Sequence, residues 1–163
     1  MTWRDAYLQQ AWSDFQVYKH LNANGYALCH QLHYLQMATE KLAKGFQCPI
    51  GGVPYPPTHF AFVKFLQNIK QRPVLYCNRL QFKSKNQFSS RIQSLLPMAD
   101  LIEKLVPTGG NYYKMNPEYP WTDTANNIYC PASYSFPEFR IRGRELLMIQ
   151  SLIINLFRLE GYE

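Results

Sequence analysis

A long central span of the chain carries positive charge that no acidic residue balances. Between Lys41 and Ala99 the sequence contains nine basic residues and no acidic one. These basic residues are Lys41, Lys44, Lys64, Lys70, Arg72, Arg79, Lys83, Lys85 and Arg91. A span of this kind produces a positive field that attracts phosphate-bearing partners. It therefore predicts binding of a nucleotide or RNA, and a solvated surface that only keeps the protein soluble remains open as the alternative.

A second basic cluster lies near the start of the last predicted helix. Arg140 and Arg144 share a helix face because they are four residues apart, whereas Arg142 points elsewhere. The candidates for phosphate binding are therefore Lys41, Lys44, His59, Lys64, Arg72, Arg140 and Arg144. For Lys44, an ion pair with Glu40 four residues earlier remains open.

Two aromatic side chains and two histidines are further candidates. Tyr119 and Trp121 could stack on bases if they are exposed, or could fix a loop across the helices. His30 and His33 are three residues apart, so two imidazoles could share a metal ion. A zinc site needs more ligands, and no cysteine or carboxylate stands at a suitable spacing. We therefore predict hydrogen-bonded or surface histidines, no metal site and no cofactor.

The composition predicts one folded domain over residues 1–163. Hydrophobic residues make up 47% of the chain and aromatic residues 15%, enough for a core without disulfides. The four cysteines form no Cys-x-x-Cys pair, which argues against a zinc ribbon or a redox motif. No secretory signal or membrane-length apolar run is visible. We expect a soluble cytoplasmic protein with reduced thiols.

The first half of the sequence predicts three helices. Thr2 and Asp5 form a capping box for a helix over residues 3–20. A short turn at residues 22–25 leads to an antiparallel second helix over residues 26–44, which Gly45 and Pro49 end. Thr58 is expected to cap a third helix that ends before Pro73.

The second half is less regular. Residues 73–87 are the least clear, with a short extended piece at 74–77 and an exposed connection or helix start at 79–85. Helical spacing resumes over residues 88–105, where Pro97 should kink or divide the element. Residues 111–135 form a long aromatic loop that should be ordered. A capping box of Ser135 and Glu138 then starts a long apolar helix, which is central or lies at a dimer seam. The sum is an all-α fold, an up-and-down bundle of four or five helices with one long aromatic loop before the last helix.

Three stretches resemble the HEPN domains (higher eukaryotes and prokaryotes nucleotide-binding). Residues 36–44 resemble the Gln-x-Ala-x-Glu-Lys-x-x-Lys pattern of their second helix. Thr58-His59 resembles the start of their third helix, and Tyr119-Pro120 the step before their last helix. The resemblance covers residues 5 to 158 in outline. It implies a HEPN-like bundle, a nucleotide-binding or partner-binding role and a homodimer, with His59 at a helix start facing the bundle.

The catalytic motif of the HEPN nucleases is absent. Those enzymes carry an Arg-x(4 to 6)-His pair, but the last histidine here is His59 and only Arg4 precedes it. We therefore expect a non-catalytic module that binds a nucleotide or RNA. Two alternatives remain: a protein-interaction or antitoxin-type module with incidental charge, and an enzyme of unfamiliar type using His30, His33 or His59.

Overall fold

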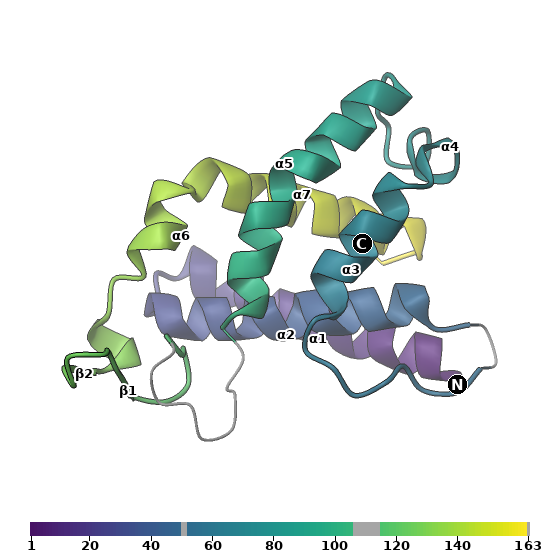
Figure 1. Ribbon diagram of the computed structural model, residues 1–163. Coiled ribbons are helices and arrows are strands. Elements are labelled where there is room, and N and C mark those ends of the chain that lie inside the picture. The colour runs from purple at the N-terminus through teal and green to yellow at the C-terminus, as the bar shows by residue number, and fades with distance from the viewer. Residues whose placement is uncertain (50–51, 106–114, 163) are drawn as a thin grey trace.

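The chain folds mainly into helices. The computed structural model describes residues 1–49, 52–105 and 115–162 (Figure 1). The helices are α1 (Trp3–Ala23), α2 (Leu28–Gln47), α3 (Ala61–Lys70), α4 (Pro73–Tyr76), α5 (Lys85–Glu103), α6 (Pro137–Ile141) and α7 (Gly143–Leu159). In the described residues the only strands are β1 (Trp121–Thr122) and β2 (Ile128–Tyr129), which pair antiparallel. The predicted all-α class is therefore confirmed. No helix of these ranges is long and apolar enough to cross a membrane.

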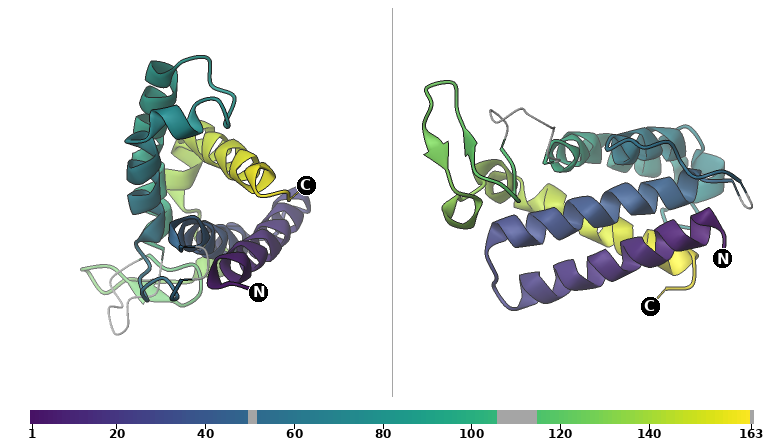
Figure 2. Two further views of the ribbon diagram at one scale, coloured as in Figure 1. Left: turned by 90° about the vertical axis from the view of Figure 1, so that its right-hand side faces the viewer. Right: turned by 90° about the horizontal axis from the view of Figure 1, so that it is seen from below.

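Helices α1 and α2 form a long antiparallel pair (Figures 1 and 2). The predicted capping box is present, since Thr2 accepts from the Asp5 amide and Asp5 accepts from the Thr2 amide. The prediction that Gly45 ends the second helix is wrong, because α2 continues to Gln47. A Cβ at position 45 would lie 2.7 Å from Leu8 Cγ of α1. Glycine therefore serves the close approach of the two helices rather than a helix end.

Helix α3 crosses α2, and α5 returns antiparallel beside α3 (Figure 1). The prediction that Thr58 caps α3 is wrong, since Phe60 is the N-cap and offers no side-chain acceptor. Pro97 does not divide the element, because it lies inside the single helix α5. Pro97 is exposed, so water can reach the carbonyl group that loses its helical donor. Ser84 caps α5 through the Gln87 amide at 3.2 Å.

The short element after α3 is helical rather than extended. Pro73 occupies the first position of α4, where a proline needs no hydrogen-bond donor. The extended piece predicted at residues 74–77 is therefore wrong. Turns and an exposed connection follow, up to the start of α5.

The predicted last helix is divided at Arg142 into α6 and α7. The capping box of Ser135 and Glu138 is absent, because Phe136 is the N-cap of α6 in a left-handed conformation with φ of 45°. Phe136 and Phe139 are buried beside the aromatic loop, whereas α7 buries its own apolar side chains against other helices. Because the chain changes direction at Arg142, Phe136 and Phe139 and the apolar side chains of α7 can all be buried. Ile141, at the end of α6, is exposed.

The described part of the aromatic loop is ordered around Trp121. Its indole stacks on Tyr129 at 5.7 Å between ring centroids and meets Tyr134 edge-on at 4.9 Å. The Asp123 carboxylate accepts from the Ala125 and Asn127 amides at 2.9 and 3.0 Å and closes the β1–β2 turn. Residues 111–114 of the predicted loop lie outside the described residues.

Helix α7 packs across α1, which brings the two ends of the chain together (Figure 2). Phe157 contacts Trp12 edge-on, with 5.0 Å between ring centroids. Gln150 Nε2 donates to the Tyr18 hydroxyl, and an ion pair joins Arg4 to Glu160. Helices α1, α2, α5 and α7 thus enclose one hydrophobic core.

Candidate functional site

The predicted phosphate ligands do not line one common pocket. Lys41 and Lys44 lie on α2, and His59 lies in the segment before α3. Each of the three contacts a carboxylate. Lys64 and Arg72 line a pocket beside α3. Arg144 lies between α5 and α7, and Arg140 is exposed on α6.

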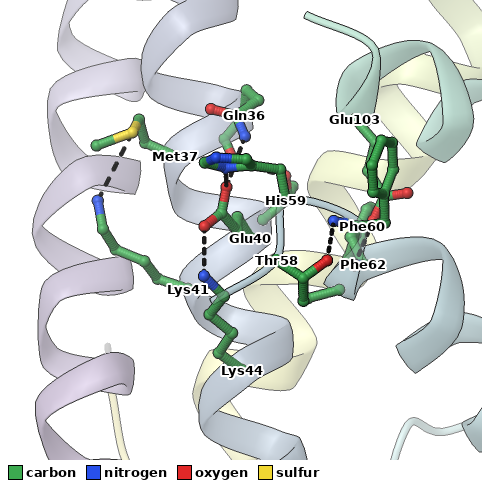
Figure 3. Close-up of polar contacts among 12 residues, drawn as sticks. Gln36, Met37, Glu40, Lys41, Lys44, Thr58, His59, Phe60, Phe62 and Glu103 are labelled. Carbon is green, nitrogen blue, oxygen red and sulfur yellow. Dashed lines mark hydrogen bonds and ion pairs between the residues drawn. The ribbon is translucent and has the colours of Figure 1, made fainter. Parts of the chain in front are cut away.

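Glu40 is the centre of a polar network on α2 (Figure 3). Its carboxylate accepts from Lys44 Nζ at 2.6 Å and from Gln36 Nε2 at 3.0 Å. His59 Nδ1, from the segment before α3, lies 2.9 Å from Glu40 Oε2. The network therefore joins α2 to the chain that enters α3. It also brings together two stretches that carry the HEPN resemblance, residues 36–44 and 58–59.

The ion pairs on α2 argue against Lys41 and Lys44 as phosphate ligands. Lys44 is only 8% exposed, and Glu40 neutralises its charge. Lys41 Nζ lies 2.6 Å from the carboxylate of buried Asp14, which also accepts from Gln10 Nε2 at 3.0 Å. Sequence spacing could not reveal this partner because it lies 27 residues away. The alternative ion-pair interpretation of Lys44 is confirmed.

The pKa of Glu40 predicts how this network responds to pH. Burial raises the pKa of Glu40, but the hydrogen bonds from Lys44 and His59 and the Lys44 charge outweigh it, so the pKa is lowered from 4.5. A lowered folded pKa contributes stability that is present above the unfolded value and is lost as pH falls through the folded one.

We expect Glu40→Gln to reduce the free energy of unfolding by about 2 kcal/mol at neutral pH, because charge-assisted hydrogen bonds are lost. The difference in free energy of unfolding between wild type and Glu40→Gln should shrink when the pH falls below the ordinary glutamate pKa. Urea denaturation followed by circular dichroism over a pH series measures it. A deficit that does not change with pH would contradict this role of the charge.

The α3 pocket is the place where predicted ligands do meet. This pocket has a volume of about 320 Å³, in the range of small-ligand sites. It is lined by Phe46, Gln47, Tyr55, Lys64, Phe65, Asn68, Ile69, Arg72 and Tyr76. The first two residues come from α2, Tyr55 from the segment before α3, and Tyr76 from α4.

The positive charge of the α3 pocket comes from one face of α3. Lys64, Asn68 and Arg72 follow one another at four-residue spacing along α3 and just beyond its end. Lys64 and Arg72 are exposed, and neither forms an ion pair with any residue that the structure describes. Both cations are therefore free to meet an anion.

Hydrogen bonds hold the polar wall of the α3 pocket in place. Gln47 Oε1 accepts from Asn68 Nδ2 at 3.2 Å and from the Tyr55 hydroxyl at 3.4 Å. Gln47 Nε2 donates to the carbonyl groups of Ala43 and Ala61, each at 3.1 Å. One glutamine thus links α2, α3 and the preceding segment before any ligand arrives.

Tyr76 closes the other side of the pocket in a positive environment. Burial raises the pKa of Tyr76, while the positive charges of Arg79 and Arg72 act in the opposite direction. The phenol is therefore neutral at physiological pH and can donate a hydrogen bond.

Sequence reasoning found the two cations of this pocket and missed Gln47, Tyr55, Asn68 and Tyr76. Only Asn68 left a signal, because it stands midway between Lys64 and Arg72. The other three lie on separate elements that only the fold brings together.

The remaining candidates take other positions. Trp121 is only 6% exposed, so the prediction that it stacks on bases is wrong, and its ring is used in the aromatic loop. Tyr119 is exposed. His33 Nδ1 lies 3.0 Å from Glu118 Oε1, and His30 is exposed. No group of three or more histidine, cysteine or carboxylate side chains suited to a metal ion occurs within residues 1–49, 52–105 and 115–162.

Comparison of the chain with protein-family models, with curated proteins and with solved structures found no match.

Proposed function

We propose that this protein is a non-catalytic binding module that holds a nucleotide or a segment of RNA in the α3 pocket. The observation that carries the proposal is the meeting of Lys64 and Arg72 at one pocket, since both are exposed and neither has a carboxylate partner among the described residues. Arginine and lysine at such a site favour a phosphate group over a neutral ligand.

The other walls of the pocket suit the rest of a nucleotide. Tyr55 and Tyr76 line the pocket with aromatic rings. Any of the bases can stack on an aromatic ring, so such a contact does not require a particular RNA sequence. Asn68 and the two phenols supply polar groups for a ribose or a base edge. The hydrogen bonds of Gln47 support preorganisation, which lowers the entropic cost of binding.

We also propose a HEPN-like arrangement of the helices. The contact of Glu40 with His59 supports this proposal, because these two residues belong to separate stretches that resemble that family. The missing Arg-x(4 to 6)-His pair supports binding without cleavage.

Fluorescence anisotropy with a labelled single-stranded RNA tests the proposal. We expect the protein to bind this RNA, and the logarithm of the affinity should fall linearly with the logarithm of the salt concentration. Replacing Lys64→Gln and Arg72→Gln together should weaken binding about tenfold and reduce the salt slope by about 1.4, the share of two phosphate contacts on a single strand. Competition with unlabelled ATP or GTP then shows whether a mononucleotide is enough.

Lys83→Gln with Lys85→Gln is the matched control. Both lysines are exposed and belong to the same acid-free span, but neither lines the α3 pocket. This pair should change the affinity less than about threefold. If the two double variants lose RNA affinity equally, only the overall positive charge of the span matters for binding. The proposal that the α3 pocket is the binding site would then fail.

A further inference from the structure

A second groove, separate from the α3 pocket, lies where α5 crosses α7. Two adjoining hollows of about 420 and 320 Å³ share Arg91, Arg144 and Met148, so they form one continuous depression. We call it the α5–α7 groove. The α7 side follows Arg144, Leu147, Met148 and Ser151, residues that recur at the spacing of one helix face.

The floor of this groove is apolar. Leu95 of α5 is buried beneath it, and Met148 is partly covered. Leu147 is 63% exposed although it lies on the apolar helix α7. Covering this apolar surface would be favourable, because it would remove apolar area from water.

The rim of the groove is positive. Arg91 comes from α5 and Arg144 from α7, and both are exposed. Neither guanidinium pairs with a carboxylate in the described part of the chain. Glu145 is the one acidic residue that lines the groove. The groove thus combines an apolar floor with two available cations.

This combination selects among the partners that could cover the groove. A second copy using the same face would bring four arginines, two from each chain, into one interface with only two copies of Glu145. RNA would meet the arginines but would leave the apolar floor without a partner. An amphipathic helix fills such a groove with apolar side chains at i, i+3, i+4 and i+7. Acidic residues beside that stripe would pair with the two arginines.

We propose that the α5–α7 groove is a docking site for an acidic amphipathic helix of a partner protein. The apolar side chains of the partner helix cover Leu147 and Met148, and the carboxylates of the partner helix pair with Arg91 and Arg144. This site does not depend on the α3 pocket, so either proposal can fail alone.

Two designed peptides of about 18 residues test the proposal by fluorescence anisotropy. They share one leucine stripe, and glutamate flanks the stripe in the first peptide and lysine in the second. We expect the wild-type protein to bind the glutamate peptide about tenfold more tightly than the lysine peptide. Arg91→Glu with Arg144→Glu should reverse that preference.

Arg140→Glu with Arg142→Glu is the matched control, because it makes the same change in net charge outside the groove. This variant should keep the preference for the glutamate peptide. Leu147→Asp should weaken the binding of both peptides about tenfold, since both peptides use the same apolar contact with Leu147. Light scattering of wild type and Leu147→Asp completes the test.

Three results would overturn the proposal. The first is equal binding of both peptides by the wild type. The second is a change of oligomeric state in Leu147→Asp, which would assign the groove to a second copy. The third is loss of RNA binding in Arg91→Glu with Arg144→Glu together with no peptide binding by the wild type.

Discussion

Replacing Glu103 with alanine is expected to lower the free energy of unfolding by about 3 kcal/mol, because it leaves two buried amide donors without an acceptor. Glu103 lies at the end of α5 and is only 5% exposed. Its Oε1 accepts from the amides of Phe62 and Val63 at 2.5 and 3.0 Å (Figure 3). These amides open α3, whose own N-cap has no side-chain acceptor. Chemical denaturation at neutral pH measures the loss.

Glu103→Gln is the control that separates the acceptor from the charge. Burial raises the pKa of Glu103 above 4.5, although the amides of Val63 and Phe62 act against it. A raised folded pKa gives stability that is complete below the unfolded pKa and is lost as pH rises through the folded one. Glutamine keeps an acceptor and cannot ionise, so this variant should be closer to wild type and less sensitive to pH in that range. An alanine variant as stable as wild type would contradict the capping role.

Gly45→Val is expected to cost about 3 kcal/mol, because the added side chain has no space between α1 and α2. A Cβ at this position would lie 2.7 Å from both Leu8 Cγ and Leu8 Cδ2, and 3.3 Å from the Leu8 amide nitrogen. Leu8 is buried, so its side chain has little room to move. Thermal and chemical unfolding of the variant measure the effect.

A double-mutant cycle with Leu8→Ala identifies the cause. Alanine at position 8 removes the atoms that valine would meet, so the two substitutions together should cost less than the sum of their separate costs. A coupling energy of about 1 kcal/mol or more is expected for residues in direct contact. Strictly additive costs would mean that the helix pair does not require glycine here.

The positions of the helices could be predicted from the sequence where periodicity and capping agree. The stripe of α1 and the Thr2–Asp5 box are local signals, and both predictions are confirmed. Local signals failed where a distant contact decides the structure. Thr58 had the right residue type for a cap, but Glu103, 41 residues from Phe62, supplies the acceptor. Gly45 had the right type for a helix end, but Leu8 determines its role.

The candidate site shows the same limit. Charge alone identified Lys41, Lys44, Lys64 and Arg72, yet it could not tell which cations are already paired. Asp14 neutralises Lys41 from another helix, and only the fold reveals this. Lys64 and Arg72 form no ion pair with a carboxylate among the residues that the structure describes. The sequence therefore identified candidate cations, and the fold decided which of them are paired.

The α3 pocket depends on the two contacts that fix the start of α3. Glu103 anchors the helix to α5, and the contact of His59 with Glu40 ties the preceding segment to α2. That segment carries Tyr55, and the helix carries Lys64. Glu103→Ala should therefore weaken RNA binding as well as stability, whereas Lys64 and Arg72 variants should affect binding alone.

Photo-crosslinking of an RNA that contains 4-thiouridine, followed by mass-spectrometric mapping of the modified peptides, tests the binding proposal most directly. We expect the crosslinks on Tyr55 and Tyr76 in the wild-type protein, and about tenfold fewer of them in Lys64→Gln with Arg72→Gln at sub-saturating RNA. Crosslinks at the wild-type level in this variant, or crosslinks that map to the α5–α7 groove or to Tyr119 instead, would contradict the α3 pocket as the site.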